Sequence, residues 1–446
     1  MLDAQTLFIT VVFGLVILCI AFNIADMTLL AMLGLCVLTV AGLVSHIDVF
    51  NAARASSGSL ALLFGGMVVA RVLAPTGIFD NLGTRFLILT GGSGRRFLLL
   101  LTALTAVVCA ILPNATAVIL IAPIVIQVCK ELDTDFTGPL ILTAIISNAA
   151  GLLTLVGDPA TFLVGQAAGL SFLRYLQKIS PGGLLSILIV IPLMPWLFGP
   201  IWKARRRLSP DLRPEPVARL GFCILSLCAL AAMVVLFLIG EHLPVPIIPP
   251  SAAIIGASLA LLALHVSRYE STEAVFRDID WRTLVFIFCM MCFVEEITKT
   301  GIMSGLSRML YAAFDDHLLE TSLALLVAIG FLSGFLANIP VVAAAVLLAK
   351  GYLVMAKVVP EIALGFGFTD WPPQSLPIFA GMMFGGTLGG NVTLIGSSAT
   401  LVAAEISASH GKPIPFAAFM RYGVPIAASQ LAASALYVWL LSLSVS

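Results

Sequence analysis

The sequence predicts an all-helical polytopic membrane protein made of two inverted repeats, each with five transmembrane spans and a re-entrant helical hairpin, and with broken helices at a central site. Three observations predict this fold class. Of the 446 residues, 60% are hydrophobic and only 10% are charged, whereas about a quarter of the residues of a soluble protein are charged. Apolar runs of membrane-spanning length follow one another along the chain, and the two halves share a pattern of residues at a constant spacing.

Charge and cysteine usage exclude other classes. The chain has 23 basic and 23 acidic residues, so it lacks the excess of positive charge with which nucleic-acid-binding proteins neutralise phosphates. Its eight cysteines lie in apolar stretches and have neither the spacing of a zinc site nor that of a disulfide framework. We therefore expect a lipid bilayer around the protein, no nucleic-acid partner, no bound metal and no cofactor.

Both halves of the chain supply membrane-spanning segments, which need about 20 residues each as helices. Apolar runs of this kind lie at residues 6–24, 27–44, 58–74, 140–168, 181–201, 218–239, 246–266, 282–299, 376–405 and 422–444.

Two further apolar regions, 97–132 and 319–358, are interrupted near their middles by Pro113-Asn114 and by Asn338-Ile339-Pro340. Such breaks in the helical hydrogen-bond ladder survive at membrane depth only where protein or a water-filled cavity satisfies the freed backbone. We predict that each region is a helical hairpin that returns to the side from which it entered.

The two halves repeat one another at two offsets. An offset of 224 residues relates these pairs: Phe64 and Phe288, Met67 and Met291, Thr76 and Thr300, Asn114 and Asn338. An offset of 239 residues relates a later set: Gly151 and Gly390, Thr154 and Thr393, Gly157 and Gly396, Thr161 and Thr400. Spacing preserved over whole segments indicates an internal duplication.

Basic residues indicate the domain boundaries and the orientation. The segment 202–217 contains Lys203 and three consecutive arginines at 205–207, and short positively charged loops stay on the cytoplasmic side of a membrane. We predict that this segment is a cytoplasmic linker and that the protein is a multi-pass protein of the plasma (inner) membrane. The linker separates a first repeat at residues 1–201 from a second repeat at 218–446. Each repeat crosses the membrane an odd number of times, so the second is inverted.

Inverted repeats with interrupted helices are typical of secondary transporters, whose sites lie where the breaks meet near the membrane midplane. The sequence lacks the G-x-x-x-x-G-K-[ST] loop of ATP-hydrolysing proteins. Its spans also contain no nucleophile–base pair or set of metal ligands, so we do not expect an enzyme. A passive channel is the alternative, and it would show no dependence of accumulation on an ion gradient.

The broken spans 140–168 and 376–405 carry the predicted site. Glycine-rich interruptions unwind a helical turn and expose carbonyl groups and helix N-termini, which suit an anion or a neutral polyhydroxylated solute. The predicted substrate-binding residues are Asn114, Thr116, Asn148, Thr154, Gly157, Asn338, Asn391, Thr393, Gly396, Ser397 and Ser398. The alternative is that both interruptions are packing kinks, because small residues are common at helix contacts in membranes.

Asp158 lies inside the first interruption and is the candidate residue for the coupling ion. An ionised carboxylate at that depth is costly unless it is paired or hydrated. The alternative role is an N-cap of the following half-helix, and the two roles can coexist.

Three other polar residues have competing interpretations. Arg71 and Glu295 occupy equivalent positions of the two repeats, where they form either structural ion pairs or charges that attract a substrate. Cys109 precedes the first hairpin tip and is either a small apolar residue or a thiol that meets a soft metalloid.

At these motifs the chain resembles the ion transporter superfamily, and most of all its arsenite permease and P-protein-like branch, which is related to the divalent anion–sodium symporters. The resemblance covers the whole chain and is sharpest at residues 154–159, 335–340 and 390–399. It implies that each repeat contributes one hairpin and one broken span to a single site, and that a transport domain moves against a scaffold.

The resemblance also bears on the substrate. Dicarboxylate symporters of the superfamily carry Ser-Asn-Thr at both hairpin tips, whereas this chain has Pro113-Asn114-Ala115 and Ala337-Asn338-Ile339, which lack the hydroxyl ligands of a sodium ion. The predicted site has uncharged polar groups and helix termini, and Arg71 is the only basic residue in the interior of a predicted span, so a neutral trihydroxy solute fits better than a dianion. We predict proton-coupled efflux of arsenite or antimonite. The alternatives are a sodium- or proton-coupled carboxylate or sulfate transporter and a cation/proton antiporter. The resemblance is compatible with a homodimer and with a soluble ATPase partner that would bind the basic linker.

Overall fold

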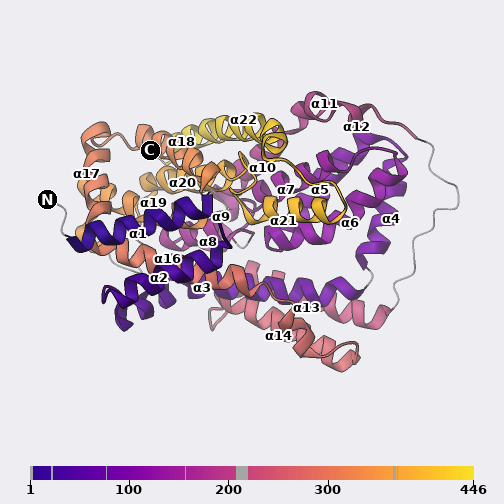
Figure 1. The fold of residues 1–446 in the computed structure, drawn as a ribbon, viewed down its shortest axis with the longest axis horizontal. Helices are drawn as coiled ribbons and strands as arrows, with labels where there is room; N and C mark the ends of the chain where they lie inside the picture. Colours follow the sequence, from indigo (N-terminus) through magenta and orange to yellow (C-terminus); the bar gives the residue numbers. More distant parts are fainter. Residues whose placement is uncertain are drawn as a thin grey trace.

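The computed structural model describes residues 4–21, 24–76, 78–155, 157–206, 219–336, 338–364, 368 and 370–445 as helices and connecting loops (Figure 1). Within these residues, eight helices are long and apolar enough to cross a membrane. The described chain forms no strand beyond an isolated bridge between Ser93 and Arg205. The predicted all-helical polytopic fold is thus confirmed.

The described residues of the first half of the chain form twelve α-helices, of which the first seven are longer than the last five. Their bounds are α1 Ala4–Ala21, α2 Met27–Val40, α3 His46–Leu73, α4 Ile78–Thr90, α5 Gly94–Cys109, α6 Asn114–Glu131, α7 Thr137–Ala150, α8 Pro159–Ala167, α9 Phe172–Lys178, α10 Ser180–Leu188, α11 Met194–Leu197 and α12 Gly199–Lys203. The predicted hairpin 97–132 is the pair α5–α6, and the broken span 140–168 is the pair α7–α8.

The second half follows the same plan. Its helices are α13 Leu220–Ile239, α14 Pro249–Ser267, α15 Thr272–Arg277, α16 Trp281–Lys299, α17 Ile302–Phe314, α18 Leu318–Phe335, α19 Asn338–Met355, α20 Leu376–Gly389, α21 Ser398–Ser409 and α22 Phe416–Leu443. The hairpin predicted at 319–358 is the pair α18–α19, and the broken span 376–405 is the pair α20–α21.

Helix bounds reproduce the two sequence offsets. Both ends of α4 and of α6 recur 224 residues later as the ends of α17 and of α19. Both ends of α7 recur 239 residues later as the ends of α20. The duplicated sequence therefore folds into duplicated structure.

The two ends of the molecule can be identified by their ion pairs. At one end, which we call the linker face, the backbone amide of Arg206 donates to the Gly92 carbonyl at 2.9 Å and its guanidinium lies 3.5 Å from the Asp133 carboxylate. At the other end, the opposite face, Asp48 near the start of α3 pairs with Lys299 at the end of α16. The helices α3 and α16, equivalent in the two repeats, thus run in opposite directions. Figure 1 shows α12 and α17 at opposite ends of the molecule.

Arg71 and Glu295 both have protein partners and do not pair with each other. The Arg71 guanidinium lies 3.0 Å from Glu270 and 2.7 Å from Asp278, while Glu295 accepts a hydrogen bond of 3.1 Å from Asn51. Arg71 therefore forms the structural ion pairs that were one of its two interpretations. Residues 207–217 of the predicted linker lie outside the described residues.

Candidate functional site

The first broken span is held together by two glycines. Helix α7 ends at Ala150 and α8 begins at Pro159. A Cβ atom at Gly157 would lie 2.8 Å from the carbonyl oxygen of Cys109 and 2.9 Å from the Cα of Gly151, so no larger residue fits at 157 without movement of the backbone. The hydroxyl of Thr154 donates a 2.7 Å hydrogen bond to the Ala110 carbonyl, which fixes the break against the end of the first hairpin helix.

The second broken span repeats this construction. A Cβ atom at Gly396 would lie 2.5 Å from the carbonyl oxygen of Gly390. The hydroxyl of Thr393 donates a 2.5 Å hydrogen bond to the Gly334 carbonyl near the end of α18. Thr393 and Gly334 are the repeat equivalents of Thr154 and Ala110, so both breaks are fixed to their hairpins by the same bond.

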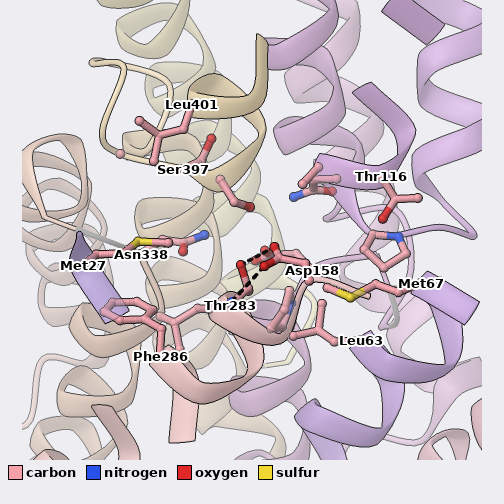
Figure 2. A pocket seen from close by; sticks show the side chains of 18 of the residues that line it. Met27, Leu63, Met67, Thr116, Asp158, Thr283, Phe286, Asn338, Ser397 and Leu401 are labelled. Carbon is pink, nitrogen blue, oxygen red and sulfur yellow. Dashed lines mark hydrogen bonds between the residues drawn. The ribbon is translucent and has the colours of Figure 1, made fainter. Parts of the chain in front are cut away.

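A cavity of about 70 Å³ lies where the two hairpin tips and the two breaks meet (Figure 2). The tips supply Pro113, Asn114, Ala115, Thr116, Asn338 and Ile339, and the broken spans supply Asp158, Pro159, Ile395, Gly396, Ser397, Ser398 and Leu401. The wall across from them comes from α2, α3 and the start of α16: Met27, Leu63, Met67, Asp280, Thr283 and Phe286. The cavity therefore lies between the duplicated hairpins and spans on one side and the helices α2, α3 and α16 on the other.

Asp158 lies in the middle of this cavity in Figure 2, although the residue is only 3% exposed. Its Oδ2 accepts hydrogen bonds of 3.3 Å from both the backbone amide and the hydroxyl of Thr161, and one of 3.4 Å from the Thr387 hydroxyl. The side chain of Asn338 also bonds to this carboxyl group. Asp158 is therefore the N-cap of α8, and the same carboxyl group joins the first break to α20 and to the second hairpin tip.

Four helices begin at the cavity. The first residues of α6, α8, α19 and α21 are Asn114, Pro159, Asn338 and Ser398, and all four line it. Helix N-termini carry partial positive charge and unpaired backbone amides. The cavity can therefore bind oxygen atoms of a solute without a cationic side chain.

About half of the residues that line the cavity are apolar, and the polar side chains among them are acidic or neutral. Asp158 and Asp280 are carboxylates, and the other polar groups are amides and hydroxyls. Among the described lining residues there is no lysine, arginine or histidine, and no cluster of three or more His, Cys, Asp and Glu residues that could hold a metal occurs in the described parts of the chain.

The structure brings most of the predicted site residues together. The cavity lining includes these predicted residues: Asn114, Thr116, Asp158, Asn338, Gly396, Ser397 and Ser398. Thr154, Gly157 and Thr393 lie in the breaks behind the lining, where they hold the backbone. Cys109 is fully buried and outside the lining.

Asn148 and Asn391 also lie behind the cavity, in a buried chain of amides. The Asn148 amide donates to the Asn391 Oδ1 at 3.1 Å, Asn391 donates to Gln430 at 2.8 Å, and Gln430 donates to the Ser186 carbonyl at 3.0 Å. Their amide groups are thus bound to protein, which contrasts with the predicted contact with substrate. In this structure both asparagines position the two broken spans.

Sequence analysis missed the wall formed by α16. Asp280 caps this helix, accepting hydrogen bonds of 3.0 Å from the Thr283 amide and 2.5 Å from its hydroxyl. The pattern of an aspartate three residues before a threonine at the start of an apolar run does signal a helix N-terminus. It does not signal that the cap faces a cavity, because that depends on the packing of α16 against the other repeat.

Comparison with known sequences matches residues 17–366 to the sequence model of the citrate transporter family, CitMHS. An uncharacterized transporter of Synechocystis sp., slr0753, is 41% identical over 98% of this chain and 98% of its own length. The P protein of Homo sapiens is 24% identical over 95% of this chain, which corresponds to 58% of that protein.

Among solved structures, the YdaH transporter of Alcanivorax borkumensis has a similar fold. The two structures superpose with a TM-score of 0.59 over 89% of this chain and 86% of that chain, at 12% sequence identity. At this level of identity the likeness concerns the fold alone.

Proposed function

The chain belongs to the citrate transporter family of the ion transporter superfamily and is a secondary transporter, and on that premise we propose that it exchanges protons for a small, uncharged, hydroxylated oxyacid. Arsenite and antimonite are the specific substrates that we propose, and their efflux is the proposed direction. The protein is placed in the plasma (inner) membrane with its basic linker in the cytoplasm, as the charge pattern favours.

The composition of the central cavity carries this proposal. Two carboxylates, four helix N-termini and several amides and hydroxyls surround a space of about 70 Å³, without a cationic side chain among the described lining residues. A multiply charged anion would face Asp158 and Asp280, and two like charges 4 Å apart repel by about 4 kcal/mol near a protein surface. A neutral trihydroxy acid avoids this repulsion, and it both donates and accepts the hydrogen bonds that the cavity offers.

Asp158 is the residue that we propose for proton coupling. Its ionised form accepts hydrogen bonds from Thr161, Thr387 and Asn338, and its protonated form could donate one to a bound solute. Moving an ionised carboxylate through the membrane interior is costly. The site would therefore cross the membrane with Asp158 either protonated or occupied by a solute that donates to it.

A carboxylate substrate is the second candidate, favoured by two observations. The family model is named for citrate, and the four helix N-termini at the cavity would stabilise a carboxylate. A protonated Asp158 would lower the repulsion, and sodium could replace the proton as coupling ion. A cation/proton antiporter that uses Asp158 as its exchange group is the third candidate, and the positive helix N-termini disfavour a cation at this cavity.

Uptake into proteoliposomes with an imposed pH gradient tests these candidates against one another. Arsenite would be followed by elemental analysis, and citrate and sulfate by radiolabel, with and without sodium. We expect arsenite accumulation that depends on the pH gradient and that excess citrate does not inhibit. Gradient-driven citrate accumulation without arsenite flux would replace the proposed substrate by the second candidate. Flux without accumulation would indicate a channel.

We also propose two partners on the basis of the superfamily resemblance. A homodimer would be detected as twice the chain mass by light scattering in detergent. A soluble ATPase would bind the linker face, where Arg205 and Arg206 lie beside Gly92 and Ser93. Neutralising Arg205, Arg206 and Arg207 should then remove the effect of the ATPase on transport, and an unchanged effect would contradict the docking proposal.

A further inference from the structure

A cavity of about 480 Å³ lies between α9, the start of α20 and the end of α22, and we call it the α9 cavity. Its lining is partly apolar and includes Trp371 and Phe379. Two cationic side chains, Arg174 and Lys178, line it from α9. It shares no lining residue with the central cavity, so it is a separate feature of the fold.

The α9 cavity lies near the opposite face. The indole of Trp371 donates a hydrogen bond of 2.8 Å to the carbonyl oxygen of Ala167 at the end of α8. Ala167 lines a smaller cavity together with Thr298, which directly precedes Lys299 of the ion pair that marks the opposite face.

A cavity at the linker face, which we call the α12 cavity, occupies the equivalent place in the other repeat. Residues 132–135, which precede α7, line the α12 cavity, and residues that precede α20 line the α9 cavity. Helix α22 reaches both, because Tyr422 lines the first and Ser444 lines the second. At a rise of 1.5 Å per residue these two positions are about 33 Å apart, and the hydrocarbon core of a bilayer is about 30 Å thick. The two cavities therefore lie at the depths of the two layers of lipid head groups.

The two cavities differ in charge. The α12 cavity is lined by two carboxylates, and one of them, Asp133, pairs with Arg206 at 3.5 Å. The α9 cavity has no Asp or Glu among its described lining residues. Within the described chain, Arg174 and Lys178 form no ion pair, and the carboxylate of Glu241 near the start of α9 accepts a hydrogen bond from a backbone amide instead. The positive charge of the α9 cavity is therefore not compensated by its lining.

We propose that the α9 cavity binds the phosphate group of an anionic phospholipid from the surrounding leaflet. Arg174 and Lys178 are four residues apart, so they lie on one face of α9, and guanidinium and ammonium groups are the usual partners of phosphate oxygens. Basic pockets between membrane helices bind anionic head groups, and tryptophan is enriched at this depth of the membrane. Trp371 and Phe379 offer apolar surface to the glycerol and the first methylene groups of a lipid. A free phosphate ion would gain nothing from that surface, so the lining favours a lipid.

Lipid titration of the purified protein tests this site without any assumption about the transported solute. Delipidated protein in a neutral detergent would be titrated with phosphatidylglycerol or with zwitterionic phosphatidylethanolamine, and native mass spectrometry would count the bound lipids. Wild type is compared with Arg174→Gln/Lys178→Gln. The matched control, Arg308→Gln/Lys357→Gln, removes two exposed cations that lie outside the cavity. Thermal unfolding establishes that each variant is folded, and inorganic phosphate serves as a soluble competitor.

We expect wild type and the control variant to bind one phosphatidylglycerol at least tenfold more tightly than phosphatidylethanolamine. Arg174→Gln/Lys178→Gln should bind phosphatidylglycerol at least tenfold more weakly than wild type. Equal affinities of the two double variants for phosphatidylglycerol would overturn the proposal, as would equal binding of both lipids by wild type. Displacement of phosphatidylglycerol by an equal concentration of inorganic phosphate would assign the cavity to a soluble anion and would also overturn it.

Discussion

Asn148 donates a hydrogen bond of 2.6 Å to the carbonyl oxygen of Thr387, the residue that occupies the equivalent position in the other repeat. A contact between equivalent residues lies on the axis that relates the two repeats. The Thr387 hydroxyl donates in turn to Asp158. The same residue, Thr387, therefore contacts both Asn148 on the axis and the candidate coupling group. The central site is therefore held by a bond that joins the two halves of the chain.

Replacing Asn148 by alanine should destabilise the fold. The substitution leaves the Thr387 carbonyl and the Asn391 side-chain oxygen without the donor that they share, and each buried polar group left unsatisfied costs about 1–3 kcal/mol. Thermal unfolding in detergent would show a lower midpoint than wild type. Ser57→Ala, at an exposed site, should leave the midpoint unchanged. An Asn148→Ala midpoint equal to that of the control would mean that this contact does not stabilise the site.

Gly396→Ala, in the second break, should impair transport more than a glycine-to-alanine substitution within a helix. The added Cβ would lie 2.5 Å from the Gly390 carbonyl oxygen, and both groups belong to the backbone of the second break. We expect at least a tenfold loss of flux. Gly305→Ala is the matched control, because its Cβ would meet nothing within 4 Å, and it should transport as wild type does. Normal flux in purified Gly396→Ala would show that the second break tolerates distortion.

Asp280→Asn should change selectivity while preserving the fold, because asparagine caps a helix about as well as aspartate does. Removing this negative charge from the cavity wall reduces the repulsion of an anion by on the order of 1 kcal/mol or more. Citrate should then inhibit arsenite flux at about fivefold lower concentration than in wild type, and the flux itself should stay similar. Asp316→Asn, on the exposed opposite face, is the control. An unchanged citrate concentration for half inhibition would argue that Asp280 does not face the solute.

The ion pair between Asp135 and Lys412 should make stability depend on acid pH. Partial burial acts to raise the pKa of Asp135, but the Lys412 ammonium 2.8 Å away and the hydrogen bonds with Thr137 outweigh it, so the pKa lies below its ordinary value of 3.8. A depressed pKa stabilises the fold above the unfolded pKa, and the contribution disappears as the pH falls through the folded pKa. This exposed pair should contribute about 0.2–1 kcal/mol. A double-mutant cycle of Asp135→Asn and Lys412→Met should show this coupling at pH 7, and the coupling should decrease progressively as the pH falls below 3.8 and through the lower pKa of the folded state. Coupling that stays constant over this range would contradict the assignment.

The duplicated plan of the fold could be predicted because it depends on patterns that are visible in short stretches of the sequence. Apolar length marks the spans, Pro113 and Pro340 accompany the hairpin tips, and the two offsets align the repeats. The bounds of α4, α6 and α7 recur at those offsets in α17, α19 and α20. Asp158 could be singled out for the same reason, since a carboxylate inside an apolar run is unusual.

The orientation of individual side chains could not be predicted in the same way. Asn148 and Thr116 are both polar residues near a break, yet the first bonds to the other repeat and the second lines the cavity. Asp280 and Thr283 line it from α16, far away in sequence. Which polar residue faces the solute depends on contacts between segments hundreds of residues apart, and no local pattern records those contacts.

Proton movement through Asp158 tests the account most directly. Proteoliposomes that contain a pH-sensitive dye would be loaded with arsenite, and internal pH would be followed as arsenite leaves, with wild type compared with Asp158→Asn and with Asp280→Asn as the matched carboxylate control. We expect internal acidification that accompanies arsenite efflux in wild type and Asp280→Asn, and none in Asp158→Asn, which keeps the cap of α8 but cannot release a proton. Acidification of equal size in Asp158→Asn would show that the proton does not use this residue, and it would contradict the proposed coupling.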